Sequence, residues 1–224
     1  MRADPREGVG GGTEVGGLEI ALLGIVLAVL LWSGIQPYDR LTWVFETAPV
    51  WLGLGILIGT YRRFRFTSLV YTLIAAHCIL LCVGGHFTYT RVPLFDWFKD
   101  VAGLSRNHYD RLGHLAQGFV PAMIAREILI RKQVVRGRGW LFTIVVALCL
   151  GVSVLYELAE AAAGITLGGK AEDFLAMQGD PWDTHADLFL ALIGALSAQL
   201  LLARRHDRAL GRLGFNPGDT VRRA

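Results

Sequence analysis

Apolar residues in this chain gather into long blocks, and six of the blocks have the length of a membrane-spanning helix. A helix needs about 20 consecutive, predominantly apolar residues to cross a bilayer core, with a range of about 17–25. The pattern predicts an all-α, polytopic membrane helix bundle with about six transmembrane helices. We expect them to cover residues 18–35, 42–61, 68–86, 112–130, 140–162 and 187–203.

Two of the predicted connections, residues 87–111 and 164–186, are longer than the others. Loops of this length in a compact domain are usually functional or disordered. They contain Trp97, Tyr109 and Trp182, and these aromatic side chains argue for order.

Lysine and arginine are unevenly divided between the two sides of the predicted bundle. Sixteen of the 22 fall in the two terminal segments and in the second and fourth connections, and six fall on the opposite side. Segments rich in these residues stay in the cytoplasm. We therefore expect a multi-pass membrane protein with both termini cytoplasmic and the two long loops extracytoplasmic.

This topology divides the chain into three parts. We expect a disordered, glycine-rich tail at residues 1–17, a six-helix membrane domain at residues 18–203 and a basic cytoplasmic tail at residues 204–224. His206 follows two arginines in the basic tail, and we expect it to be solvated.

Composition and charge exclude several classes of protein. Hydrophobic residues make up 53% of the chain and charged residues 18%, against about 45–50% and about 25% in soluble domains. A soluble enzyme, a disulfide-stapled secreted domain and a disordered chain are therefore excluded. The net charge is only +3, and basic residues are not interleaved with aromatic ones, so we expect no nucleic acid partner. Cys78, Cys82 and Cys149 lie inside apolar blocks and are interpreted as packing residues.

Polar residues gather at one depth of the predicted bundle, near its extracytoplasmic end. A histidine ends the third segment, and an Asp–His–Gln series at the 4–3 spacing of one helix face begins the fourth. Two glutamates one turn apart end the fifth segment, and two aspartates one turn apart begin the sixth. The set comprises His86, Asp110, His114, Gln117, Glu157, Glu160, Asp183 and Asp187.

Such a set can be read in three ways. Inserting one carboxylate costs about 2.5–3.5 kcal/mol, so several together need protons, arginines or a metal ion. Histidine and carboxylates from facing helices build metal sites in bundles, and they suit zinc, iron or manganese. A network of ion pairs and a headgroup site without a metal are the alternatives. For one divalent metal ion, the expected ligands are His86, Asp110, His114 and Asp187.

The same residues suggest a division of roles if the protein is an enzyme. Metal-assisted hydrolysis or transfer is then favoured, with Glu157 or Asp183 as general base. The residues expected to bind a substrate are Arg106, Arg111, Gln117 and Trp182.

Three stretches resemble the YjdF-like bacterial inner-membrane proteins. They are PLFDW at Pro93–Trp97, SRNHYDR at Ser105–Arg111 with Gly113-His114 after it, and QGDPWDT at Gln178–Thr184. The resemblance implies a membrane-embedded protein of a family without an established activity.

A fainter resemblance is to VanZ-like membrane proteins, which carry D-K-x-x-H on one helix, E-x-x-Q on the next and an Asp with N-x-x-G on the last. Here Asp110 to His114 has arginine in place of the lysine, and Glu157 to Glu160 replaces E-x-x-Q. Asp187 precedes an A-x-x-G rather than N-x-x-G. VanZ-like proteins are associated with resistance to lipophilic glycopeptides, so this resemblance implies envelope lipids or cell-wall intermediates as substrates.

The leading hypothesis is an inner-membrane protein of the cell envelope with an outward-facing polar site, acting on an envelope lipid or similar amphiphile. Membrane lipids and that amphiphile are its expected partners, and no oligomeric state is predicted. A small proton-coupled transporter and a non-enzymatic envelope scaffold are the alternatives. A carrier is expected to have discontinuous helices or repeated halves, and no repeat is evident in the sequence.

Overall fold

The computed structural model of the chain describes residues 16–167 and 176–215. Every regular element within these ranges is a helix, so the predicted all-α fold class is confirmed. Residues 1–15 and 216–224 of the two predicted tails lie outside the described residues. The elements are α1 (Gly17–Ser33), α2 (Arg40–Thr60), α3 (Ser68–Phe87), the 3-10 turn η1 (Tyr89–Arg91), α4 (Pro93–Ala102), α5 (Tyr109–Arg131), α6 (Arg138–Leu167) and α8 (Asp183–Arg212).

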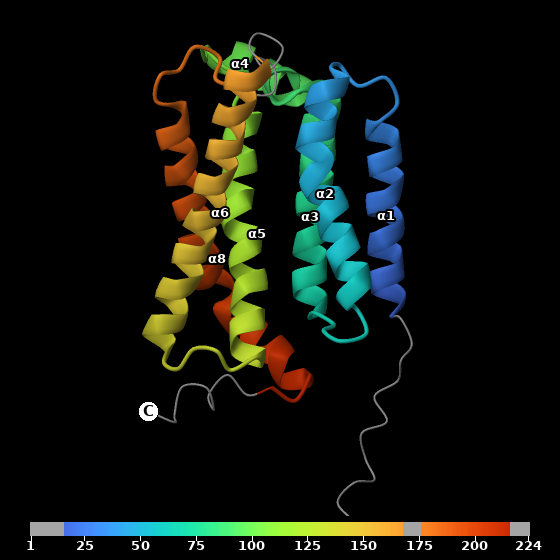
Figure 1. Cartoon of the computed structure of the whole chain (residues 1–224), viewed down its shortest axis with the longest axis vertical. Helices are drawn as coiled ribbons and strands as arrows, with labels where there is room; N and C mark the ends of the chain where they lie inside the picture. The colour runs from blue at the N-terminus through green and yellow to red at the C-terminus, as the bar shows by residue number, and fades with distance from the viewer. Residues whose placement is uncertain (1–15, 168–175, 216–224) are drawn as a thin grey trace, which may run out of the picture.

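The long helices stand side by side, and α4 lies across one end of the bundle (Figure 1). Helices α1 and α2 pack on α3 in one half of the bundle, and α5, α6 and α8 form the other half. Contacts between α3 and α5 join the halves. Helices α5 and α8 both begin at the end where α4 lies, so they run parallel (Figure 1).

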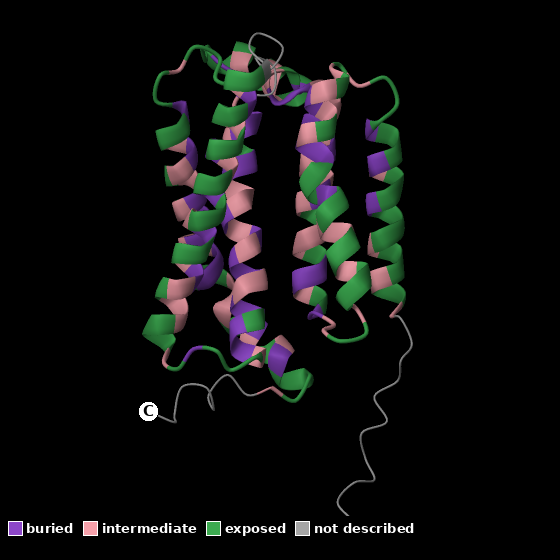
Figure 2. Cartoon of the chain, viewed as in Figure 1, coloured by how far each residue is buried: buried purple, intermediate pink, exposed green. Residues whose placement is uncertain are grey.

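Four of the described helices, α2, α3, α6 and α8, are long and apolar enough to cross a membrane. Helix α1 is apolar but has only 17 residues, and α5 contains no stretch of the same length that is apolar enough to count as a span. The outward surfaces of the bundle are rich in exposed side chains, including large ones such as Leu31, Ile58 and Leu155 (Figure 2). An apolar exterior of this kind suits a lipid environment.

Polar caps fix where two of the helices begin. The Asp39 carboxylate accepts a hydrogen bond from the Thr42 backbone N–H at 2.7 Å, which caps α2. Thr67 caps α3 in the same way through Val70 N–H. Each cap satisfies one backbone donor that the first turn of a helix leaves without an intrahelical partner.

Several helices extend beyond the predicted apolar blocks. The predicted loop at residues 87–111 contains η1 and α4, and α5 begins at Tyr109. Helix α8 continues past residue 203 to Arg212, because His206 and Leu210 extend its buried face. His206 is fully buried, so the expectation of a solvated histidine is wrong.

Helices α5 and α8 touch backbone to backbone at two glycines. A Cβ atom on Gly118 would meet the Ala191 carbonyl, and one on Gly194 would meet the Leu115 carbonyl and the Phe119 amide nitrogen. Small residues allow this kind of close approach between membrane helices. The contact sets the spacing between the side chains that α5 and α8 carry toward each other.

Candidate functional site

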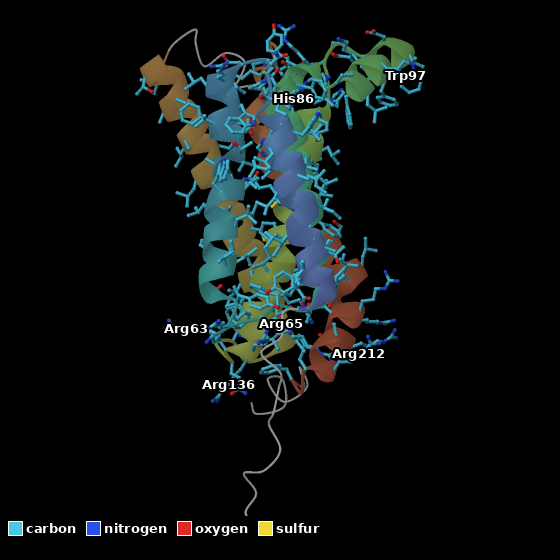
Figure 3. All side chains as sticks on the ribbon, turned by 90° about the vertical axis from the view of Figure 1, so that its right-hand side faces the viewer. Arg63, Arg65, His86, Trp97, Arg136 and Arg212 are labelled. Carbon is cyan, nitrogen blue, oxygen red and sulfur yellow. The ribbon has the colours of Figure 1, made fainter. Side chains whose placement is uncertain are left out.

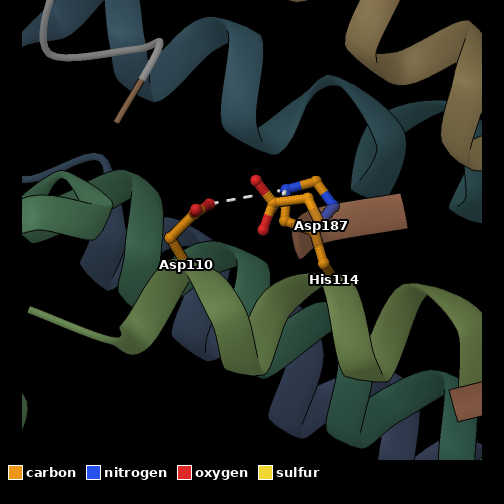
Figure 4. A group of neighbouring side chains, drawn as sticks. All are labelled: Asp110, His114 and Asp187. Atoms are coloured by element: carbon orange, nitrogen blue, oxygen red, sulfur yellow. Dashed lines mark ion pairs between the residues drawn. The ribbon is translucent and has the colours of Figure 1, made fainter. Parts of the chain in front are cut away.

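The first turns of α5 and the start of α8 bring a histidine between two carboxylates. Asp110 and His114 lie one turn apart on α5, and His114 Nε2 lies 3.5 Å from Asp110 Oδ1. The same nitrogen lies 3.9 Å from Asp187 Oδ1 on α8 (Figure 4). One ligand atom from each residue lies within 4.8 Å of the other two, and all three residues are buried. We call these three residues, with Glu157, the His114 cluster.

Glu157 approaches His114 from the other side of the ring. Its Oε1 lies 3.7 Å from His114 Nδ1, and the residue comes from α6. Neither atom has a hydrogen-bond partner among the described residues, although both are buried. Buried polar atoms are nearly always paired in folded proteins. Within the described residues, the hydrogen-bonding capacity of the cluster is therefore not fully used.

Two arginines close the cluster on the side of the predicted extracytoplasmic loops. Arg106 donates to Asp183 Oδ1 at 2.6 Å and to the Ala176 carbonyl at 3.2 Å. Its Nη2 also lies 3.6 Å from Asp110 Oδ2. Arg106 is buried, so these contacts hold a positive charge above the carboxylates.

Arg111 makes a second set of contacts with the start of α8. It donates to Asp187 Oδ1, to the Asp183 carbonyl at 3.0 Å and to Asp180 Oδ2 at 2.9 Å. Its Nη2 lies 2.9 Å from Asp183 Oδ1. Both arginines are thus engaged by aspartates, and the Asp183 carboxylate interacts with both of them.

The segment before α8 is tied to the segment before α5 by paired amides. Asn107 N–H donates to Gln178 Oε1 at 2.9 Å, and Gln178 Nε2 donates back to the Asn107 carbonyl at 2.9 Å. Gln178 and Gly179 both have positive φ, at 50° and 79°. This turn places Asp180 beside the two arginines.

Arg106 and Arg111 shift the pKa values of two titratable groups in these loops, Asp180 and His108. The Trp182 N–H, together with Arg111 and Arg106, holds the pKa of Asp180 below its ordinary value. Burial and the same two arginines hold the pKa of His108 below its ordinary value. Both shifts favour a negative loop and a neutral histidine above the cluster.

A cavity of about 270 Å³ opens beside the His114 cluster, between α2, α3, α5 and α6. Asp110 and His114 line it at one end, and Gln117 lies further along the same face of α5. The remaining lining includes Glu46, Pro49, His77, Leu81, Tyr89, Val152, Tyr156 and Glu160. The cavity therefore combines carboxylates and imidazoles with apolar walls.

The cavity includes polar residues that the sequence analysis did not propose. Glu46 is buried on α2, and its Oε2 accepts a hydrogen bond from the Tyr156 hydroxyl at 3.1 Å. His77 lies in the middle of α3 and also lines the cavity. A glutamate within an apolar helix is costly to insert, and this cost was the signal that could have identified Glu46.

His86 does not join the His114 cluster. Its Nδ1 lies 3.0 Å from the Ser33 carbonyl, and its ring contacts Trp32 and Phe87 at centroid distances of 4.5 and 4.6 Å. These contacts place it between the ends of α1 and α3, on the side of α3 that faces α1. The prediction that His86 is a metal ligand together with Asp110, His114 and Asp187 is therefore wrong.

The four residues expected to bind a substrate do not lie together in the structure. Gln117 lines the cavity, whereas Arg106 and Arg111 are held by aspartates. Trp182 is 67% exposed and stacks edge-on against His185. Asp183, expected as a general base, lies against the arginines and not along the cavity wall.

A second buried polar group lies at the other end of α5 and α8. Glu127 Oε2 accepts hydrogen bonds from the Thr67 hydroxyl at 2.7 Å and from His206 Nε2 at 3.0 Å. Glu127 Oε1 accepts from Thr67 N–H and from Arg131, both at 2.9 Å. Arg126 donates to His206 Nδ1 at 2.8 Å. Arg126 also forms an ion pair with Asp207. We call these residues the Glu127 network: Thr67, Arg126, Glu127, Arg131, His206 and Asp207.

Comparison with known proteins places most of the chain in one family. Residues 18–208 match the family model described as "Predicted membrane protein (DUF2238)". The chain is also 47% identical over 190 residues to "Inner membrane protein YjdF" of Escherichia coli (strain K12), which covers 85% of this chain and 91% of that protein. No solved structure gives a significant match. The resemblance to YjdF-like proteins is confirmed, and the chain belongs to the DUF2238 family of predicted membrane proteins.

Proposed function

We propose that this protein is a multi-pass enzyme of the inner membrane that binds one divalent metal ion at Asp110, His114 and Asp187. The observation that carries the proposal is the placement of the His114 ring, with Nε2 toward two carboxylates and Nδ1 toward a third. Metal-binding histidines usually turn their second nitrogen toward a carboxylate or carbonyl, which fixes the ring and its tautomer. Glu157 has that position here.

The distances suit a small divalent ion. Two ligand atoms that each lie about 2.1 Å from a tetrahedral ion are about 3.4 Å apart. His114 Nε2 lies 3.5 Å from Asp110 Oδ1 and 3.9 Å from Asp187 Oδ1.

Metal-assisted hydrolysis or group transfer on an amphiphile is the reaction that this site would support. A bound divalent ion lowers the pKa of its water and polarises a phosphoryl or carbonyl oxygen. Asp110 and His114 line the cavity, so a substrate there would face the ion. Leu81, Val152 and Pro49 supply apolar walls for the hydrophobic part of an envelope lipid or similar molecule.

Continuous helices favour a fixed site over a carrier. Carriers typically hold their substrates at broken helices near the middle of the membrane. Helices α5, α6 and α8, which supply the His114 cluster, are each continuous in the described residues. An enzymatic role therefore accounts for the geometry better than transport does. A scaffold role does not explain why buried atoms of the His114 cluster lack partners among the described residues.

The proposed orientation has both termini in the cytoplasm and the His114 cluster on the extracytoplasmic side. Arg63, Arg65, Arg136 and Arg212 lie at one end of the bundle, with His86 and Trp97 at the other (Figure 3), which fits the cytoplasmic preference of basic segments. The name of the Escherichia coli relative assigns that protein to the inner membrane. A membrane-impermeant thiol reagent applied to intact cells should label Ser105→Cys but not Arg136→Cys. The reverse pattern would contradict the orientation.

Metal analysis of purified protein tests the proposed function most directly. Wild-type protein purified in mild detergent without chelator should contain about one divalent ion per chain. His114→Ala should lose it, whereas the control His86→Ala should keep it, because His86 lies against α1. A metal-free wild type that also fails to bind zinc, iron or manganese after dialysis would refute the proposal. Envelope lipids incubated with wild type and with Asp110→Asn should then reveal the substrate as the species that only the wild type converts.

A further inference from the structure

The half of the bundle away from the His114 cluster contains a larger groove, most of whose lining residues are apolar. It has a volume of about 600 Å³ and lies between α1, α2 and α3, toward the end where α2 and α3 are connected. Its walls include Leu22, Leu23, Val26, Leu54, Leu57 and Ile74. Helices α1 and α2 each pack on α3, and the groove lies between them.

A glycine keeps part of the groove open. A Cβ atom added to Gly59 would meet no atom within 4 Å, so a larger side chain could enter the space there. Gly59 itself lines the groove near the end of α2. The walls and this open position give the groove the shape and chemistry of a slot for a hydrocarbon chain.

Two arginines lie at the mouth of the groove without an ion-pair partner among the described residues. Arg62 and Arg63 line it and are exposed, and neither side chain makes an ion pair with a described residue. Arg65, by contrast, pairs with Glu19 at 2.8 Å and lies over the Tyr61 ring. The mouth therefore carries an excess of positive charge beside an apolar slot.

We propose that this groove binds an anionic phospholipid, with an acyl chain between α1 and α2 and the headgroup phosphate against Arg62 and Arg63. Arginine matches the geometry of phosphate oxygens and often binds them in pairs. Basic pockets between transmembrane helices on the cytoplasmic side bind anionic headgroups. The two arginines lie at the arginine-rich end of the bundle, where Figure 3 shows Arg63. The groove is separate from the His114 cluster, so this proposal stands independently of the proposed enzymatic function.

Native mass spectrometry of the full chain, released from detergent, tests the proposal. Phosphatidylglycerol and phosphatidylcholine with the same acyl chains are added in equal amounts, and sn-glycerol 3-phosphate is offered in a separate sample. We expect the wild type to retain phosphatidylglycerol in preference to phosphatidylcholine. It should not retain sn-glycerol 3-phosphate, because the acyl chain is needed. Equal retention of both lipids, or retention of sn-glycerol 3-phosphate alone, would overturn the proposal.

Two variants with one matched control locate the lipid. The double variant Arg62→Ala, Arg63→Ala should lose about 25-fold in preference for phosphatidylglycerol, since each basic residue near an anionic surface contributes about 1 kcal/mol. The control Arg136→Ala, Arg138→Ala removes the same charge from exposed residues that do not line the groove, and it should keep the preference. Gly59→Phe should reduce retention of both lipids by filling the slot. A control that behaves like the Arg62, Arg63 variant would place the lipid elsewhere and overturn the assignment.

Discussion

The His114 cluster and the Glu127 network are two versions of the same arrangement, at opposite ends of the α5–α8 pair. Each buries a histidine among carboxylates and arginines. Among the described residues, both carboxylate oxygens of Glu127 and both ring nitrogens of His206 have partners in the Glu127 network, whereas the buried Arg131 Nε has none. In the His114 cluster, His114 Nδ1 and Glu157 Oε1 have none.

The two regions also differ in charge. The Glu127 network balances Glu127 and Asp207 against Arg126 and Arg131. Around His114, carboxylates outnumber the two arginines, and further acids line the adjoining cavity. A buried group whose carboxylate and imidazole are both paired stabilises the fold, whereas unpaired acidic groups beside a cavity can still bind a ligand. This is the difference that the proposed function requires between a structural polar region and a ligand site.

The largest expected effect is on stability, at the Glu127 network. Glu127→Ala leaves Thr67, His206 and Arg131 without their buried partner, and removing one member of a buried ion pair typically costs about 3–5 kcal/mol. Glu157→Ala should cost less than about 1 kcal/mol, because its Oε1 is already unpaired. Thermal unfolding of metal-free protein in detergent compares the two variants. Equal losses would remove the distinction between the regions.

The next effect concerns the helix contact that sets the spacing of the proposed metal ligands. Gly194→Ala places a Cβ atom against the α5 backbone, so α5 and α8 must separate, at a cost of about 1–3 kcal/mol. Because His114 and Asp187 lie on the two separated helices, bound metal should fall as well. Gly151→Ala is the control, since a Cβ atom there meets nothing within 4 Å. A Gly194→Ala protein with full metal content would show that the contact does not position the ligands.

A smaller effect is expected from pH in the loop that covers the cluster. The pKa of Asp180 lies below its ordinary value of 3.8. The Asp180 carboxylate therefore helps to anchor the loop at any pH above 3.8, and this contribution is lost only as the pH falls below 3.8. Hydrogen exchange at residues 176–182 should therefore be unchanged between pH 7 and pH 5, after correction for intrinsic rates. Asp180→Asn should raise exchange throughout this range. Increased opening of the wild-type loop at pH 5 would contradict this assignment.

The smallest effect is expected at Trp182. The side chain is largely exposed and its ring contacts His185, so Trp182→Ala should change stability by no more than about 0.5 kcal/mol. It should also leave metal content unchanged. A loss of metal in this variant would show that the loop, and not only the α5–α8 pair, holds the cluster together.

The helical fold could be predicted because apolar blocks report directly on helices in a lipid environment. The spacing of Asp110 and His114 likewise put both on one face of α5, as the structure shows. The depth of each residue along the bundle was predictable too. It placed Asp187 and His114 at the same level, and the structure has them 3.9 Å apart. Sequence spacing within each helix was therefore a reliable guide to part of the site.

Depth alone could not show which helices face each other, and this explains the residues that were misplaced. His86 lies at the cluster's end of the bundle, but α3 turns it toward Trp32 and Ser33 of α1. Glu46 was missed because its partner, Tyr156, is 110 residues away. His206 looked solvated because its partners, Arg126 and Glu127, lie on another helix.

The Glu127 network has a fixed direction of hydrogen bonding. Arginine can only donate, so Arg126 makes His206 Nδ1 an acceptor and leaves Nε2–H to donate to Glu127. A histidine that relays protons must receive a proton at one ring nitrogen and release a proton from the other. In His206, the hydrogen bond from Arg126 occupies Nδ1, so Nδ1 cannot receive a proton. The hydrogen bonds of the Glu127 network therefore hold His206 in one tautomer, and they do not form a path for proton transfer through its ring.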